Sequence, residues 1–151
     1  MARTRSMLTA AALVAVSVGG ATALAAPASA ATTASVTPQS VCGSNYKTVN
    51  SAPVGSRGTV YLTYNAYNGN NCVVTVRTTT GTAVDMSAYL YVPDTDQGDG
   101  DYGQYTSYAG PIYAYGKGHC VDWGGSIGNV SVYVTGSNCA ALKEQRVTVT
   151  R

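Results

Sequence analysis

The sequence predicts an all-β fold, a small antiparallel β-sandwich stapled by two disulfides, with a small β-barrel as the alternative. Short runs rich in β-branched and aromatic residues alternate apolar and polar side chains with a period of two, which gives a strand one core face and one solvent face. Turns rich in Gly and Asn separate these runs at short intervals. Beyond the first 30 residues, no window shows sustained helical periodicity. Many short strands with such turns are typical of sandwiches and barrels.

The N-terminal 30 residues have the features of an export signal. Arg3 and Arg5 precede an apolar run that ends near Ala26, and Ala28-Ser29-Ala30 supplies the pattern read by signal peptidase. The run is weakly hydrophobic and ends at a cleavage motif, whereas a membrane anchor would end at a charged stop. We therefore interpret residues 1–30 as a secretory signal peptide, and expect no membrane association after cleavage.

The net positive charge of the chain, +2, comes from this signal. Nine Lys and Arg, less Arg3 and Arg5, leave seven, which equals the seven Asp and Glu of the chain. The mature chain is therefore neutral and lacks the basic surface that nucleic acid or anionic lipid requires. Its length, about 120 residues, suits one domain.

We divide the mature chain into three parts. Residues 31–40 are expected to be a flexible leader, 41–139 a single β-domain, and 140–151 a tail that adds at most one strand. An Asn68-Gly69 pair predicts a tight hairpin turn, because both residues tolerate positive φ. In chain order, the expected strands are Tyr46–Val49, Thr59–Asn65, Cys72–Thr78, Ser87–Val92, Tyr102–Tyr108, Pro111–Tyr115, His119–Gly124, Val130–Thr135 and, in the tail, Arg146–Thr150.

All four cysteines lie in the mature part of the chain. An even number in an exported chain predicts two disulfides, since the compartment outside the membrane is oxidising. A metal site would require C-x-x-C pairs and more than the one histidine present. Three pairings are allowed. We favour Cys42–Cys72 and Cys120–Cys139, because each joins neighbouring elements.

No catalytic site is expected. His119 is the only candidate general base, and the nearest carboxylate, Asp122, lies three residues further on. In a strand this odd spacing sends the two side chains to opposite faces. No serine lies in a G-x-S-x-G elbow, and no carboxylate pair is placed for glycoside hydrolysis. The sequence therefore predicts a protein that is not an enzyme and has no cofactor.

An acidic segment, Asp94–Asp101, suggests a calcium loop because hard cations bind clustered carboxylates. The EF-hand pattern fails, however, since Gly98 stands at the third ligand position and Asp99 at the position of the turn glycine. We favour a solvated acidic turn between strands.

Aromatic residues offer the candidate binding surface. If the aliphatic residues between them face the core, then Tyr89 and Tyr91 face solvent, and so do Tyr113 and Tyr115. Were the two strands neighbours, these four tyrosines would form one stripe able to stack on sugars or pack against another coat component. Trp123 is expected in the core.

Six runs, in order, resemble the spore-associated protein A family of streptomycetes: VCGSNYK, TVYLTYN, NNCVVTVRT, SAYLYV, SYAGPIYA and HCVDWGG. The resemblance covers roughly Val41 to Cys139. It implies a small exported protein of the spore or aerial-growth surface, and no active-site residue is inferred from it. The acidic segment Asp94–Asp101 and the tail beyond Cys139 look unlike the family.

The sequence thus predicts a secreted, disulfide-stabilised, non-catalytic protein associated with the spore or aerial-growth surface. Its expected partners are spore-surface or cell-wall components, polysaccharide among them. The alternatives are a carbohydrate-binding module, which needs several coplanar exposed rings, and a small inhibitor of an extracellular hydrolase. An inhibitor needs a protruding loop with an anchor residue, and Tyr67 is the candidate for that role.

Overall fold

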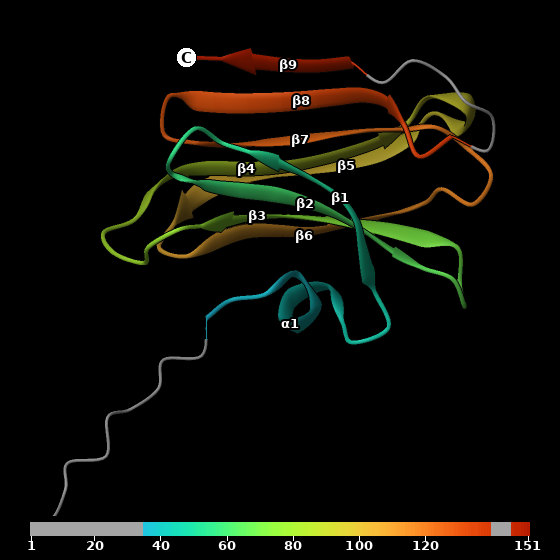
Figure 1. Ribbon diagram of the computed structural model, residues 1–151, viewed down its shortest axis with the longest axis horizontal. Coiled ribbons are helices and arrows are strands. Elements are labelled where there is room, and N and C mark those ends of the chain that lie inside the picture. The colour runs from blue at the N-terminus through green and yellow to red at the C-terminus, as the bar shows by residue number, and fades with distance from the viewer. Residues whose placement is uncertain (1–34, 140–145) are drawn as a thin grey trace, which may run out of the picture. The chain divides into compact units, whose positions relative to one another are not determined.

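Two antiparallel sheets pack face to face in the computed structural model, which describes residues 35–139 and 146–151 (Figure 1). The predicted all-β sandwich is confirmed, and the two sheets do not close into a barrel. The predicted signal peptide and residues 31–34 of the predicted leader lie outside the described residues. The elements are α1 (Pro38–Cys42), β1 (Lys47–Pro53), β2 (Gly58–Asn65), β3 (Asn70–Arg77), β4 (Val84–Val92), η1 (Pro93–Thr95), β5 (Gln97–Tyr105), β6 (Tyr108–Tyr115), β7 (Val121–Ile127), β8 (Val130–Ser137) and β9 (Arg146–Thr150).

Sheet A has the strand order β1-β2-β3-β6, and sheet B has the order β5-β4-β7-β8-β9. The hairpin predicted around Asn68-Gly69 joins β2 to β3, in a register that pairs Asn65 with Asn70. Gly69 adopts a φ of 77° there, as the turn requires. The tail supplies β9, which pairs with β8 at the edge of sheet B. No helix within the described ranges is long and apolar enough to cross a membrane.

The acidic segment differs most from its prediction. Instead of one acidic turn, a short 3-10 helix, η1, is followed by strand β5, which already begins at Gln97. Strand β5 pairs with β4 along its whole length, and the turn to β6 falls at Thr106 and Ser107. The residues GDGD have low strand propensity, but β5 is an edge strand whose ladder is supplied by the strongly β-forming β4.

Two other boundaries also shift. Helix α1 begins at Pro38, inside the predicted leader, because Thr37 and Ser40 cap it reciprocally: each side chain accepts a hydrogen bond from the other's backbone N–H. Strand β1 continues to Pro53, whereas the predicted strand ended at Val49. Proline is tolerated there because β1 lies at the edge of sheet A.

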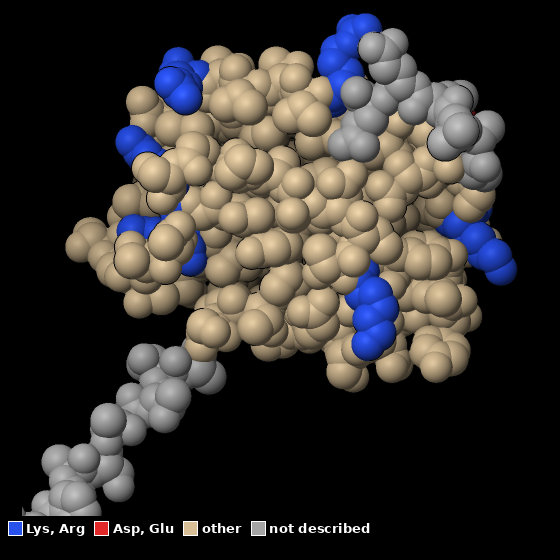
Figure 2. Space-filling view, viewed as in Figure 1, with Lys and Arg blue, Asp and Glu red and all other residues tan. Residues whose placement is uncertain are grey.

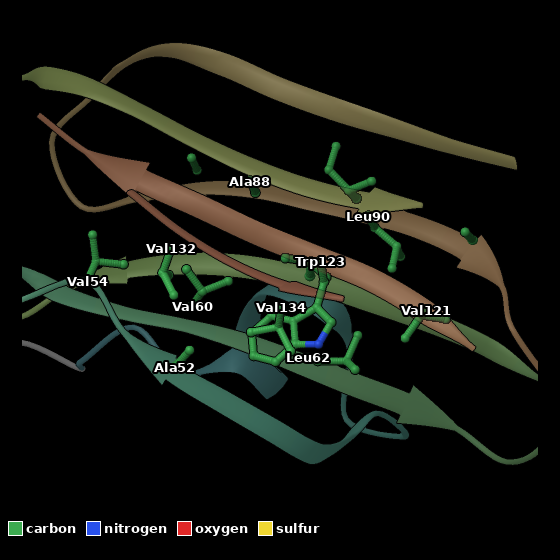
Figure 3. Close-up of a cluster of buried hydrophobic side chains, with 14 of the residues drawn as sticks. Ala52, Val54, Val60, Leu62, Ala88, Leu90, Val121, Trp123, Val132 and Val134 are labelled. Carbon is green, nitrogen blue, oxygen red and sulfur yellow. The ribbon is translucent and has the colours of Figure 1, made fainter. Parts of the chain in front are cut away.

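Most of the hydrophobic core lies between the two sheets (Figure 3). Trp123 is fully buried in it, as predicted, among aliphatic side chains that include Leu62 and Leu90. Its indole Nε1 donates a hydrogen bond to the hydroxyl of Ser137 (2.8 Å). A second cluster lies on the other face of sheet A, under α1, and consists of Cys42, Tyr46, Cys72 and Val74. Strand β3 is therefore buried on both faces.

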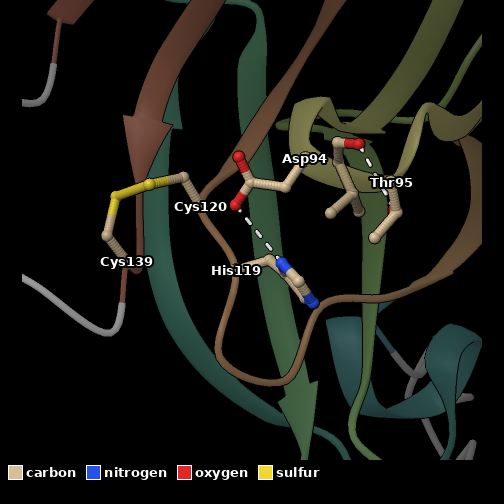
Figure 4. Close-up of polar contacts among 6 residues, drawn as sticks. Asp94, Thr95, His119, Cys120 and Cys139 are labelled. Carbon is tan, nitrogen blue, oxygen red and sulfur yellow. Dashed lines mark hydrogen bonds and ion pairs between the residues drawn. A yellow bond between two sulfur atoms is a disulfide. The ribbon is translucent and has the colours of Figure 1, made fainter.

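Both favoured disulfides are confirmed. Cys42–Cys72 ties helix α1 to strand β3, and Cys120–Cys139 ties the start of β7 to the end of β8 (Figure 4). The first bond joins a helix outside the sheets to a strand, and the second joins the flanking residues of two paired strands; such covalent links suit a domain with a modest core.

Candidate binding surface: the tyrosine face of sheet B

The four tyrosines selected from sequence face away from the core, but on opposite sides of the molecule. Tyr89 and Tyr91 lie on β4 in sheet B, whereas Tyr113 and Tyr115 lie on β6 in sheet A. Strands β4 and β6 are not neighbours in one sheet; they pack across the core. The four rings therefore do not form a single stripe.

Tyr113 and Tyr115 help to hold the covering of sheet A. The ring of Tyr113 meets that of Tyr46 edge-on at 5.6 Å, and its hydroxyl donates to the carbonyl of Cys42 (3.1 Å). Burial, followed by the proximity of Tyr46, raises the pKa of Tyr113. The ring of Tyr115 lies over Gly69 in the β2–β3 turn. Both side chains remain partly exposed, but their contacts are with α1 and the hairpin of the same chain.

Tyr89 and Tyr91, together with Tyr102 and Tyr133, form what we call the tyrosine face, on the outer side of sheet B. Tyr89 is central, 5.7 Å from Tyr133 in an edge-to-face arrangement and 6.5 Å from Tyr91 in a stacked one. Tyr102 on β5 and Tyr133 on β8 are 66% and 41% exposed. The face crosses β5, β4, β7 and β8, so the tertiary structure joins rings from strands that are distant in sequence.

Glycines opposite the tyrosines leave room for the rings. Gly98 pairs with Tyr91, and Gly124 lies between Tyr89 and Tyr133 in register. A Cβ atom on Gly100 would lie 2.4 Å from the ring of Tyr102, so that ring lies down over the glycine. Likewise, a Cβ on Gly124 would lie 3.1 Å from the ring of Tyr133. Because rings fill the space above the glycines, the outer surface of sheet B is aromatic here and lies close to the backbone.

Carboxylates lie around the tyrosine face. Asp96 accepts a hydrogen bond from the hydroxyl of Tyr91 (2.7 Å), and Asp122 on β7 accepts one from the backbone N–H of Gly136 (2.7 Å). Asp85 accepts a bond from the side-chain amide of Gln104. The hydroxyls of Ser87 and Ser126 share a hydrogen bond (2.8 Å) on the same side of the sheet.

The carboxylates also affect the pKa values of the tyrosine hydroxyls. The hydrogen bond to Asp96 is the main reason that the pKa of Tyr91 is raised. Burial, and then the charge of Asp122, raises the pKa of Tyr89; burial, then Tyr133 and Asp99, raises that of Tyr102. These hydroxyls therefore stay protonated well above neutral pH and remain able to donate hydrogen bonds.

Sequence reasoning missed Tyr102 and Tyr133 as candidates. For Tyr133 the signal is present, since Val132 and Val134 are buried and alternate with it. For Tyr102 the signal is the alternation Gly98, Gly100, Tyr102, Gln104 along one face of β5, which the interpretation as an acidic turn obscured.

His119 and Asp122 do not meet. The imidazole Nδ1 lies 3.2 Å from a carboxylate oxygen of Asp94, in a partly exposed pair at the surface (Figure 4). The described residues hold no group of three His, Cys, Asp or Glu placed to bind a metal ion. Asp101, the last of the acidic segment, accepts hydrogen bonds from the N–H of Gly110 (2.7 Å) and from the hydroxyl of Tyr105. The carboxylates of this segment thus have separate partners.

Comparison with known proteins gives one match at high identity. The chain is 54% identical over 119 residues to spore-associated protein A of Streptomyces coelicolor, in an alignment that covers 78% of this chain and 77% of the relative. The chain belongs to the spore-associated protein A family. No solved structure matches this chain, and no protein-family model matches it.

Charge is unevenly distributed in this family member. In the view of Figure 2, several Lys and Arg side chains are visible and no Asp or Glu is. Among the described residues, the aspartates lie on or beside the strands of sheet B, at positions 85, 94, 96, 99, 101 and 122. The two disulfides fit a stable protein of an extracellular or surface location.

Proposed function

We propose that this chain is an exported, non-catalytic protein of the spore or aerial-growth surface, which docks onto surface material through the tyrosine face. The observation that carries the proposal is the contiguity of Tyr89, Tyr91, Tyr102 and Tyr133 on the outer side of sheet B. Export is inferred from the N-terminal 30 residues. The relative's name, spore-associated protein A, supports the location.

The two outer sheet faces differ in a way that supports docking. Helix α1 and Tyr46 cover the outer side of sheet A. The outer side of sheet B carries four tyrosines, and helix α1, the one α-helix of residues 35–139 and 146–151, packs on sheet A instead. Single exposed tyrosines are ordinary, whereas a contiguous cluster marks an interaction surface. Tyrosine offers a rigid apolar ring and a hydroxyl, which is why it is enriched at interfaces.

A non-catalytic role is supported by the placement of the titratable groups. His119 is paired with Asp94 at the surface, and Asp122 is held by the backbone of Gly136. General acid–base catalysis needs such groups to converge on one reacting atom. Here the histidine and the carboxylate of Asp122 are directed to different partners.

One observation favours inhibition of a hydrolase as a second candidate function. Tyr67, at the tip of the β2–β3 hairpin, is 89% exposed. The turn that carries it is fixed by hydrogen bonds from the N–H of Tyr67 to the side chain of Asn65 (3.0 Å) and from the N–H of Gly69 to the carbonyl of Asn65 (2.9 Å). A rigid loop with one protruding aromatic side chain is the form of an inhibitor anchor.

Retention on spores tests the proposed function. The oxidised mature protein would be incubated with intact spores and with vegetative cell walls over a salt series. We expect retention on spores to fall about tenfold or more in the double variant Tyr102→Ala, Tyr133→Ala, since the loss of one hot-spot tyrosine costs about 2 kcal/mol and about 1.4 kcal/mol is a tenfold change. The control is Tyr67→Ala, Tyr115→Ala, which removes two exposed rings elsewhere.

Three results would contradict the proposal. Equal losses in the two double variants, or no loss in the first, would show that the tyrosine face is not the docking surface. Absence of retention of the unaltered protein on any surface would overturn the surface role and favour the inhibitor.

A further inference from the structure

We propose that the ligand of the tyrosine face is a polysaccharide bearing unsubstituted amino groups, whose sugar rings stack on the tyrosines while its ammonium groups pair with the bordering aspartates. This inference rests on the proposed function, because it assigns a ligand class to the same face.

The arrangement of the rings suits a sugar polymer. Tyr102, Tyr89 and Tyr133 follow one another across β5, β4 and β8, with β7 between the last two. The strands that carry the outer two tyrosines are three inter-strand spacings apart, about 14 Å at about 4.8 Å each, so the face is wide enough for a short oligosaccharide rather than for one sugar. The rings of Tyr102 and Tyr133 lie low over Gly100 and Gly124, and the ring of Tyr89 meets that of Tyr133 at 60°, so the row offers a ligand both ring faces and a ring edge.

The polar groups of this face suit a ligand rich in hydroxyls. Each tyrosine ring carries a hydroxyl, which is protonated at neutral pH because the pKa of a phenol is about 10. Ser131 and Thr148 point to the same side of the sheet, since each pairs in register with an outward residue. A face that alternates rings and hydroxyls matches the C–H and O–H faces of a sugar better than the apolar core of a protein interface.

The charge selects among polysaccharides. Asp85, Asp96 and Asp122 lie on or beside the face: Asp85 and Asp122 pair in register with outward residues, and Asp96 accepts the hydrogen bond from Tyr91. Among the described residues, the cation on this side of the sheet is Arg146, on the edge strand β9. The excess of aspartates over this one arginine repels polymers that carry phosphate or uronic acid and attracts a cationic polymer.

Asp122 is the carboxylate best placed to bind an ammonium group. It sits opposite Tyr91 in register, beside the central Tyr89. Its Oδ1 is held by the N–H of Gly136, and this bond fixes the carboxylate in place. An asparagine there retains an oxygen that can accept this bond, so the variant Asp122→Asn removes the charge and keeps the support.

Calorimetric titration with two hexasaccharides tests the inference: the hexamer of glucosamine, with free amines, and the hexamer of N-acetylglucosamine. We expect the glucosamine hexamer to bind the unaltered protein about tenfold more tightly at low salt, with the difference shrinking as salt rises. In Asp122→Asn the preference for the free amine should fall by about 2- to 5-fold, the range for one exposed ion pair. The control Asp94→Asn makes the same change of net charge at a carboxylate engaged by His119, and should leave the preference unchanged.

The outcomes separate this inference from the proposed function. Spore retention that depends on Tyr102 and Tyr133, together with equal affinity for the two hexamers, would overturn the amino-sugar assignment and leave docking through the tyrosine face intact. Equal effects of Asp122→Asn and Asp94→Asn would also overturn it, since the attraction would then follow net charge. If the double tyrosine variant kept both its spore retention and its affinity for the glucosamine hexamer, both proposals would fail.

Discussion

Removal of the hydroxyl of Ser137 offers the sharpest test of how the core is held. Trp123 and Ser137 are both buried, and the indole Nε1 donates to the Ser137 hydroxyl, which donates in turn to the carbonyl of Val121 (3.2 Å). In Ser137→Ala the indole N–H loses its partner inside the core. An unsatisfied buried donor costs about 1–3 kcal/mol of the free energy of unfolding.

The thermal shift follows from the size of the domain. The entropy of unfolding is about 2.1 cal/mol/K per residue, or about 0.25 kcal/mol/K for about 120 residues. A loss of about 1–3 kcal/mol therefore lowers Tm by about 4–12 °C. Urea unfolding and thermal scans, followed by circular dichroism, would measure both quantities. Ser131→Ala, on the outer side of the same strand, is the control and should change the stability by less than about 0.5 kcal/mol.

A double-mutant cycle isolates the hydrogen bond from other effects. Trp123→Phe retains an aromatic ring and lacks the N–H donor. In that background Ser137→Ala leaves no orphaned indole, so its cost should be lower by about 1 kcal/mol or more. If Ser137→Ala costs the same in both backgrounds, to within about 0.3 kcal/mol, the reasoning about the indole N–H is refuted.

Three further predictions concern the phenols, a disulfide and a glycine. The pKa is raised for Tyr89, Tyr91, Tyr102, Tyr105 and Tyr113, which predicts a class of phenols that ionises above the usual value of about 10. Because the folded-state pKa exceeds the unfolded one, the stability associated with these phenols is present below about pH 10 and is lost above it. An ultraviolet titration that shows a single unshifted class of phenols would contradict this prediction. Replacing Cys42 and Cys72 by serine opens a loop with a sequence separation of 30 and should cost about 3–4 kcal/mol in chemical denaturation, whereas a cost under about 1 kcal/mol would show that the unfolded chain is little constrained by it. Gly100→Ala should displace the ring of Tyr102 and weaken spore retention while Tm changes little, and unchanged retention would argue against the low-lying ring as a docking element.

Patterns within single strands predicted much of the local structure. The alternation along β4 placed Ala88, Leu90 and Val92 in the core and directed Tyr89 and Tyr91 outward, and all five positions were right. The Asn-Gly pair located the β2–β3 hairpin, and the pairing of cysteines in neighbouring elements favoured the two disulfides that form. These features depend on residues a few positions apart or on elements close along the chain.

The candidate binding surface depended on contacts that are remote in sequence. Period-two alternation fixes on which side of its own strand a residue lies, because that is a property of the extended backbone. Which strands become neighbours depends on pairing across long stretches of chain, which no local pattern specifies. The sequence therefore determined that Tyr89 and Tyr113 both face outward. Only the tertiary structure decided that Tyr113 packs beneath α1, while Tyr89 meets Tyr133 across Gly124 on the exposed side of sheet B.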